Sequence, residues 1–224
     1  MIFFVHVDIV SRVPPFFIGI PFRNRIDLLK AAIESMPSYR REVVVINNSD
    51  EIALEGLGVR TVITPPTPLT FAQSMNVFRK MAMEGGLPFY LFAHSDMRAS
   101  DATIEGLLKQ CRHWADRWGC LFTSYDALCA VNTVAAAEVG EWDPNLPQYF
   151  ADNDYYRRMA MAKYPCTDSG LKVFHEPSQT IKSDFRLNFL NAQTFPLHRR
   201  YYEAKWGGPS GQERFTLPFN GALA

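Results

Sequence analysis

Three groups of polar side chains in this sequence have the types and spacing that metal binding or proton transfer requires. In chain order they are residues 47–50 (Asn-Asn-Ser-Asp), 94–96 (His-Ser-Asp) and 152–154 (Asp-Asn-Asp). Carboxylate oxygens bind hard divalent cations, and a carboxylate that can reach a hydroxyl group can act as a general base. Each group alone has a simpler explanation, because acids commonly end strands and begin helices. The fold must bring the groups together if they are to form a site.

The first two groups follow short apolar runs that predict buried strands. Residues 89–93 read Phe-Tyr-Leu-Phe-Ala, directly before His94. Continuous apolar runs of this length are typical of parallel strands covered on both faces. Strands are predicted in this way over residues 16–22, 42–47, 59–63 and 89–94. Because the carboxyl ends of parallel strands meet at one edge of a sheet, we expect the polar groups to converge there.

Segments with helical spacing of apolar residues alternate with these strands. The first is a helix capped by Asn24 and ended by Pro37, and the clearest runs from 101 to 118 between the N-cap Ser100 and Gly119. Helices are also predicted over residues 71–84, 132–139 and 152–163. The alternation predicts an α/β fold, with a mostly parallel central sheet flanked by helices.

The remainder of the chain is less regular. Residues 120–131 predict one or two strands, and 171–175 predict a last strand that ends at His175. Residues 176–224 combine prolines, glycines and aromatic side chains with little periodicity, which predicts a wrapping C-terminal tail. We expect a single domain over residues 1–224.

Composition excludes several classes of protein. Lys plus Arg equal Asp plus Glu at 23 each, so the net charge gives no support to nucleic-acid binding. The four cysteines form no CxxC pair, which argues against a structural zinc site and for reduced thiols. The N-terminal apolar residues lack the basic flank of a signal peptide and are too few to span a bilayer. These features favour a cytoplasmic protein without a transmembrane segment.

Five segments, in order, carry a resemblance to a known family. They are Ile18-Gly-Ile-Pro-Phe-Arg-Asn-Arg, residues 43–50, residues 89–97, Gly140-Glu-Trp-Asp-Pro-Asn with the block 149–158, and Lys205-Trp-Gly-Gly. In these motifs and their order the chain resembles the family 2 glycosyltransferases. Their catalytic domain has the nucleotide-sugar-binding GT-A fold, a Rossmann-like nucleotide-binding architecture. The resemblance covers residues from about 17 to 208. It implies a nucleotide-binding half over about 16–97 and an acceptor-side half over about 98–175.

The resemblance implies an inverting, hexosyltransferase-type enzyme that moves a sugar from a UDP- or GDP-sugar to a hydroxyl of a glycan, a lipid-linked acceptor or a protein. Asp96 matches the last acid of the family's Asp-x-Asp motif and His175 a second ligand, to Mn²⁺ in preference to Mg²⁺. Asp152 matches the general base, with Asp154 beside it as a second catalytic acid. The residues expected at the nucleotide are Pro21, Phe22, Arg23, Asn47, Ser49, His94 and Ser95.

The sequence departs from the family's pattern at three positions that are usually acidic: Asn47, His94 and Ala151. A neutral His94 can still hydrogen-bond a ribose hydroxyl, but it adds less negative charge to the metal site. These departures keep open a second interpretation, a sugar-nucleotide-binding module that has lost turnover. A nucleotidyltransferase is a third, although the segment from 20 to 25 contains no glycine-rich phosphate loop.

Overall fold

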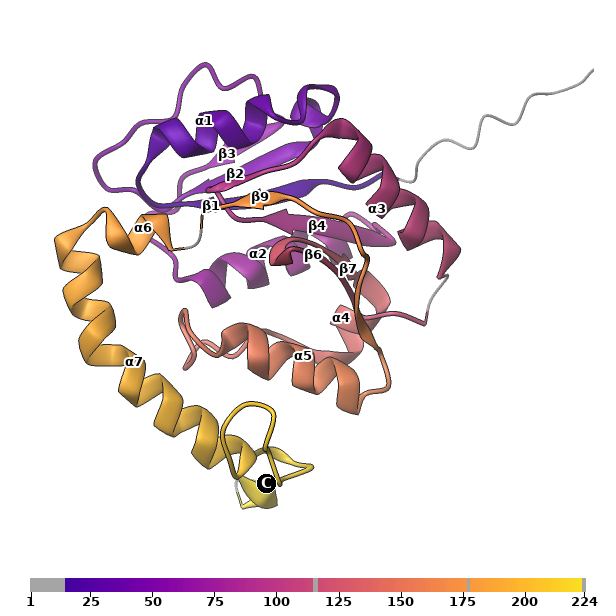
Figure 1. The fold of residues 1–224 in the computed structure, drawn as a ribbon, viewed down its shortest axis with the longest axis vertical. Coiled ribbons are helices and arrows are strands. Elements are labelled where there is room, and N and C mark those ends of the chain that lie inside the picture. The colour runs from indigo at the N-terminus through magenta and orange to yellow at the C-terminus, as the bar shows by residue number, and fades with distance from the viewer. Residues whose placement is uncertain (1–14, 115–116, 177, 223–224) are drawn as a thin grey trace, which may run out of the picture.

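The structure, a computed structural model, describes residues 15–114, 117–176 and 178–222. A central sheet of seven strands has the order β3-β2-β1-β4-β7-β6-β8, and a small second sheet pairs β5 with β9. Helices cover both faces of the central sheet (Figure 1). The predicted α/β architecture with a mostly parallel sheet is confirmed.

One half of the central sheet is parallel. It contains β1 (Ile18–Phe22), β2 (Val43–Asn47), β3 (Thr61–Ile63) and β4 (Phe89–Ala93). All five residues of β2 and of β4 are buried, as continuous apolar runs predict. Their carboxyl ends therefore place the polar residues that follow at one edge of the sheet.

The other half contains antiparallel strands. It is made of β6 (Cys120–Thr123), β7 (Tyr125–Asn132) and β8 (Cys166–Asp168). β7 runs antiparallel to β4, with Ala93 opposite Leu128, so the beginning of β7 lies at the same edge as the end of β4. This reversal adds Tyr125 and Asp126 to the edge where the parallel strands end. The third strand, β8, was not predicted.

The helices form two layers, each with its own apolar core. One layer contains α1 (Ile26–Glu34) and α3 (Asp101–His113), and the other contains α2 (Phe71–Glu84), α4 (Thr133–Val139) and α5 (Ala151–Met161). The short elements are η1 (Pro37–Glu42), β5 (Met97–Arg98), β9 (Phe174–His175), α6 (Gln179–Lys182) and η2 (Pro218–Gly221). None of the helices within the described ranges combines the length and apolarity needed to cross a bilayer.

Several predicted helix ends are wrong. α3 has its N-cap at Ser100, which accepts from the backbone of Thr103 at 3.2 Å, but it ends at His113 and leaves Trp114 42% exposed rather than in the core. Asn24 does not cap α1, because its side-chain amide donates to the carbonyl of Thr180 at 2.9 Å. The N-cap of α1 is Arg25, in the left-handed conformation. Tertiary contacts thus decide these ends.

The predicted tail is a long helix, α7 (Phe185–Trp206), followed by irregular chain. Asp184 caps α7 through hydrogen bonds to the backbone of Arg186 and Leu187 at 2.8 and 3.1 Å. The prediction missed α7 because its apolar residues do not gather on one face and Pro196 lies inside it. α7 runs from α6, near the parallel strands, to the region beside α5 (Figure 1).

Close packing of α2 on β1 depends on Gly19. A Cβ atom at this position would lie 2.6 Å from Cδ2 of Phe78, a buried residue of α2. We expect Gly19→Ala to lower the free energy of unfolding by about 1–3 kcal/mol, because the added methyl group overpacks the core. Urea denaturation measures the loss. The double variant Gly19→Ala/Phe78→Leu should recover part of it, and a double variant no more stable than the single one would contradict this explanation.

Candidate metal centre and acceptor edge

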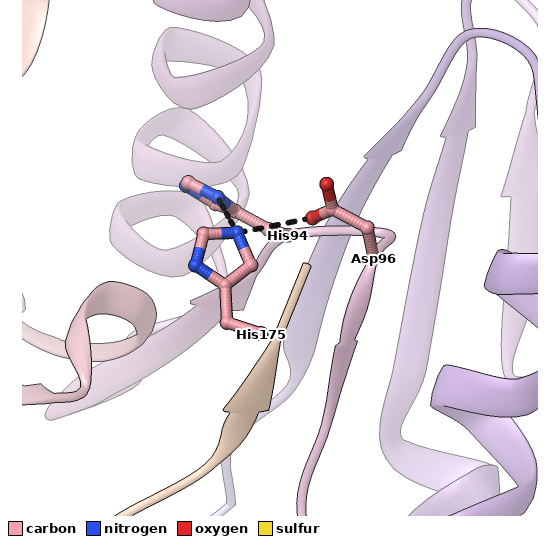
Figure 2. A group of neighbouring side chains, drawn as sticks. All are labelled: His94, Asp96 and His175. Carbon is pink, nitrogen blue, oxygen red and sulfur yellow. Dashed lines mark hydrogen bonds and ion pairs between the residues drawn. The ribbon is translucent and has the colours of Figure 1, made fainter. Parts of the chain in front are cut away.

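Three side chains meet just beyond the carboxyl end of β4: His94, Asp96 and His175 (Figure 2). Nε2 of His175 lies 3.2 Å from Oδ1 of Asp96 and 3.4 Å from Nδ1 of His94. Asp96 is 8% exposed, and the two histidines are partly buried. The structure therefore brings together the two residues predicted as metal ligands and adds His94 to them.

The backbone fixes the positions of these residues. The amide of His94 donates to the carbonyl of Ala127 at 2.8 Å, which continues the β4–β7 pairing past the end of the strand. The chain then turns into β5, and Met97 pairs with His175 in β9. This pairing sets His175 beside Asp96, although the two residues are far apart in the sequence. The contact could not be derived from sequence spacing, because β9 is only two residues long.

The Asp96 carboxyl is held in its ionised form. Burial raises the pKa of this carboxyl, but the hydrogen bond with His175 and the charges of His94 and His175 together outweigh burial, so the pKa lies below its ordinary value. The backbone amide of Gln179 donates to Oδ2 at 3.3 Å. An ionised carboxylate is the form that binds a cation.

The three side chains fit a divalent cation. Metal–ligand bonds of about 2.1 Å at right angles place neighbouring ligand atoms about 3 Å apart. The distances of 3.2 and 3.4 Å between neighbouring atoms are close to that spacing, and one ligand atom from each of the three residues lies within 4.8 Å of the others. One carboxylate and two imidazoles leave further coordination positions for a ligand or water.

Asp126 lies next to this centre and was missed by the sequence analysis. It is 3% exposed, its Oδ2 accepts from the hydroxyl of Tyr156 at 2.9 Å, and its Oδ1 has no hydrogen-bond partner. Oδ1 faces Nε2 of His94 at 3.7 Å. The polar groups singled out in the sequence follow strands or begin helices, whereas Asp126 stands at the beginning of an antiparallel strand. A search of both ends of 120–131 would have found it.

Asp152 lies in the first turn of α5, at the same edge of the sheet. Its Oδ2 accepts a short hydrogen bond from the hydroxyl of Tyr125. Burial raises the pKa of the Asp152 carboxyl, the negative charge of Asp126 raises it further, and the hydrogen bond from Tyr125 offsets only part of this. A carboxylate with a raised pKa is a stronger base than an ordinary aspartate, which suits it to accept a proton.

A hollow of about 470 Å³ opens beside Tyr125. Asn153, Tyr156 and Arg157 of α5 form one side of it, and Gly211 and Glu213 contribute from the segment after α7. The hollow is large enough for part of a small molecule. Tyr125 borders this hollow, and its hydroxyl donates the hydrogen bond to Asp152.

Asp154 is enclosed by other side chains. It is fully buried, and its carboxylate is 2.7 Å from the Lys205 ammonium, 2.9 Å from Nε of Arg158 and 2.9 Å from the Trp206 indole nitrogen. Lys205 also lies 2.7 Å from Asp143. This cluster ties α5 to the end of α7. The structure therefore places Asp154 apart from Asp152, which shares its helix turn but faces the sheet edge.

The residues predicted at the nucleotide surround the ends of β1 and β2. Arg23 forms a short hydrogen bond to the carbonyl of Asn48 and an ion pair with Asp50 at 3.3 Å. The Asn47 side chain donates to the carbonyl of Ile52 at 2.9 Å and accepts from the amide of Ser49 at 3.1 Å. Asn47 therefore shapes its own loop.

Two predicted nucleotide residues, Pro21 and Phe22, are the last two residues of β1 and precede Arg23. Phe22 is fully buried beneath the edge, and Pro21 is partly exposed. Ser95 is partly exposed in the turn between His94 and Asp96. Ser95 and Pro21 thus present some surface at this edge.

Four non-glycine residues around these sites have the left-handed backbone conformation. They are Arg25, Tyr125, Phe150 and Ser178, with φ between 44° and 66°. Each such residue costs on the order of 1–3 kcal/mol and persists only where the surrounding structure enforces it. Tyr125 directly precedes Asp126, and Phe150 directly precedes α5. Ser178 is the N-cap of α6, next to Gln179, whose amide donates to Asp96. Part of the backbone strain in the described residues therefore lies where the candidate site is built, while Lys163, Phe219 and Asn220 adopt the same conformation elsewhere.

Comparison with solved structures yields many matches to this fold. A mannosyltransferase from Pyrobaculum calidifontis, solved with GDP-Man and Mn²⁺, superposes with a TM-score of 0.58 at 14% identity, over 84% of this chain and 63% of that one. Glucosyl-3-phosphoglycerate synthase from Mycobacterium tuberculosis, solved with Mn²⁺, UDP and glucosyl-3-phosphoglycerate, superposes with a TM-score of 0.56 at 12% identity. The match covers 85% of this chain and 78% of the synthase. TarS from S. aureus superposes with a TM-score of 0.57 at 13% identity, over 80% of this chain and 39% of TarS.

The chain has the GT-A fold. At these identities the similarity to glycosyltransferases establishes the GT-A fold and no activity. No protein-family model and no curated protein matches the sequence. The chain spans less than two thirds of the mannosyltransferase and of TarS. Within the GT-A fold the centre around Asp96 lies at the carboxyl edge of the parallel strands, where open α/β sheets bind ligands.

Proposed function

We propose that this protein is a metal-assisted glycosyltransferase of the family 2 type, which transfers a hexosyl group from a UDP- or GDP-sugar to an acceptor hydroxyl with inversion. The observation that carries the proposal is the position of two different groups on one sheet edge of a GT-A fold. One is the pair Asp96 and His175, with His94 beside it, and the other is Asp152, a carboxylate with a raised pKa.

In this proposal Asp96 and His175 hold a divalent cation, Mn²⁺ in preference to Mg²⁺. Such a cation neutralises the diphosphate that leaves with the nucleoside. The ionised form of Asp96 and the closeness of His175 support this role. Solved structures of the same fold that contain Mn²⁺ with GDP-Man or UDP also support it.

Asp152 acts as the general base. It accepts the proton of the acceptor hydroxyl while that oxygen forms a bond to the anomeric carbon and the bond to the diphosphate oxygen breaks. Tyr125 holds the carboxylate through its hydroxyl and borders the hollow that receives the acceptor. The acceptor is a glycan, a lipid-linked sugar or a protein.

Asp154 supports the reaction by position. Its contacts with Arg158, Lys205 and Trp206 fix the first turn of α5, and with it Asp152. At the other side of the edge, Pro21, Phe22, Arg23, Asn47, Ser49 and Ser95 form the nucleotide-binding region. There Arg23 supplies positive charge, and Asn47 and Ser49 shape the loop.

Nucleotide-sugar turnover tests the proposal. Incubation with a panel of UDP- and GDP-sugars, Mn²⁺ and candidate acceptors should release nucleoside diphosphate and form a glycosylated product. We expect Asp96→Ala to lower the rate by about 10²-fold, because an electrostatic contribution at the leaving group is lost. The matched control is Glu84→Ala, which removes an exposed acid of α2 and should leave the rate unchanged. Equal rates in wild type and Asp96→Ala would contradict a metal-assisted transfer.

A non-catalytic sugar-nucleotide-binding module is the second candidate. The observation in its favour is that His94, Asn47 and Ala151 stand where the resembled family usually has acids, which leaves fewer carboxylates for catalysis. Isothermal calorimetry distinguishes the two candidates. Tight binding of a nucleotide sugar together with no turnover, in the presence of Mn²⁺ and the full acceptor panel, would favour the module.

A further inference from the structure

We propose that His94 is itself a metal ligand, through Nδ1, and that Asp126 positions it, so that the centre has two histidines and one carboxylate and selects transition-metal ions over Mg²⁺. The proposal rests on the metal-assisted function above. A direct measurement of metal binding tests it whether or not sugar transfer occurs.

The two ring nitrogens of His94 face different partners. Nδ1 points toward His175 Nε2 at 3.4 Å, as Figure 2 shows, and Nε2 points toward Asp126 Oδ1 at 3.7 Å. A histidine that served only to pack the loop would not need a polar partner at each of its two ring nitrogens. His94 thus stands between the centre and a buried acid.

Asp126 is held in a position from which it can accept a hydrogen bond from His94. It is 3% exposed, and the Tyr156 hydroxyl fixes one of its oxygens at 2.9 Å. The other oxygen, Oδ1, is buried without a hydrogen-bond partner. An unpaired buried acceptor is costly, typically by about 1–3 kcal/mol. A small rotation of the His94 ring would let Nε2–H donate to Oδ1 and satisfy it.

This arrangement selects the tautomer that binds a metal. A neutral imidazole carries its proton on one nitrogen and offers a lone pair on the other. When Asp126 accepts from Nε2–H, the lone pair is on Nδ1, which faces His175 Nε2 in the centre. Ligating histidines in metal sites almost always donate their other N–H to a carboxylate, a carbonyl or water in this way.

The donor set decides which ions bind. Mg²⁺ prefers oxygen ligands and gives up its water reluctantly, whereas imidazole suits the later first-row ions. Two imidazoles and a single carboxylate therefore favour first-row transition-metal ions such as Co²⁺ over Mg²⁺. His94 stands where the resembled family has an acid, so the exchange of that acid for histidine moves the preference away from Mg²⁺.

Cobalt is the probe, because its visible absorption reports the ligands directly. We expect the metal-free protein to bind Co²⁺ with no nucleotide present, and an excess of Mg²⁺ to leave the bound Co²⁺ in place. His94→Ala should lower the Co²⁺ affinity by about 10- to 100-fold, at least the effect of losing an outer carboxylate. The matched control, His113→Ala, removes an exposed histidine of α3 and should bind Co²⁺ like the wild type.

Two further variants test the role of Asp126 and the ion preference. Asp126→Asn should weaken Co²⁺ binding by about 10- to 100-fold, while its amide oxygen still accepts from Tyr156. His94→Asp should let Mg²⁺ displace Co²⁺. Circular dichroism confirms that each variant is folded.

The proposal is overturned if His94→Ala and Asp126→Asn both bind Co²⁺ within twofold of the wild type, or if Mg²⁺ displaces Co²⁺ from the wild type at equal concentration. A failure of the protein to transfer sugar would be a separate result, because it does not bear on Co²⁺ binding. Co²⁺ binding that depends on His94, in a protein that transfers no sugar, supports the metal centre and contradicts only the glycosyltransferase assignment.

Discussion

Replacement of Asp152 by asparagine is expected to lower kcat for sugar transfer by about 10²–10⁴-fold, the usual contribution of a general base. Asparagine has nearly the same shape, and its amide oxygen can still accept from the Tyr125 hydroxyl, so α5 should stay in place. It cannot accept the proton of the acceptor hydroxyl. Steady-state assays with the best donor and acceptor measure the effect.

Metal binding provides the control for this variant. Asp152 is not among the three residues of the metal centre, so Asp152→Asn should bind Co²⁺ with the affinity of the wild type. A loss of kcat together with a loss of Co²⁺ binding would show that the substitution acts through the structure of the edge. An unchanged kcat would remove Asp152 from the mechanism.

The pH profile of transfer gives the same assignment an independent test. Because the pKa of Asp152 is raised, the base becomes protonated, and activity falls, at a pH above the ordinary value of 3.8 for an aspartate. The Tyr125 hydroxyl lowers this pKa, so Tyr125→Phe should move the acid limb of kcat to higher pH. A limb that moves to lower pH would contradict the contact between Tyr125 and Asp152.

Removal of the Lys205 ammonium is expected to cause the largest loss of stability. Lys205 is 6% exposed and lies 2.7 Å from both Asp143 and Asp154. In Lys205→Met the aliphatic part of the side chain is kept, but two buried carboxylates lose their shared cation. Breaking a buried ion pair by removing one partner costs about 3–5 kcal/mol, since the remaining charge is left uncompensated.

Urea denaturation measures this effect against Lys80→Met. Lys80 forms an exposed pair with Glu84 at 3.8 Å, and such pairs contribute about 0–1 kcal/mol. The free energy of unfolding should therefore fall several times further in Lys205→Met than in Lys80→Met. Similar losses in the two variants would show that other partners, Arg158 at Asp154 among them, compensate the two carboxylates without Lys205.

The sequence was sufficient to predict the parts of the fold that local physics determines. The buried strands β2 and β4 are continuous apolar runs, and α2 has the bounds predicted for it because Thr70 and Gln73 form a capping box at its start. The position of Asp96 at the end of β4 follows from the same reasoning. These features depend on residues that are near one another in the chain.

The features that were missed depend on distant residues. Asp126 reaches the sheet edge only because β7 is antiparallel to β4, and no local pattern gives a strand's direction. A strand ending at His175 was predicted and is β9, but the proximity of His175 to Asp96 was expected from the family resemblance alone, because no local pattern predicts that β9 pairs with β5. The enclosure of Asp154 could not be foreseen, because its partners Lys205 and Trp206 lie in α7, which the sequence pattern hides.

The pairing of Asp154 with α7 also sets an order of assembly during protein synthesis. Trp206 follows Asp154 by 52 residues, so at 5–20 residues per second the ribosome takes about 3–10 s to supply it. During this interval the Asp154 carboxylate lacks the donors from α7, and its burial in the final position is unfavourable. The parallel strands β1 to β4 need no residue from α7 for their pairing and can form meanwhile. We therefore expect the parallel strands to pair before α7 has been made, whereas the first turn of α5 gains its contacts with Lys205 and Trp206 only afterwards.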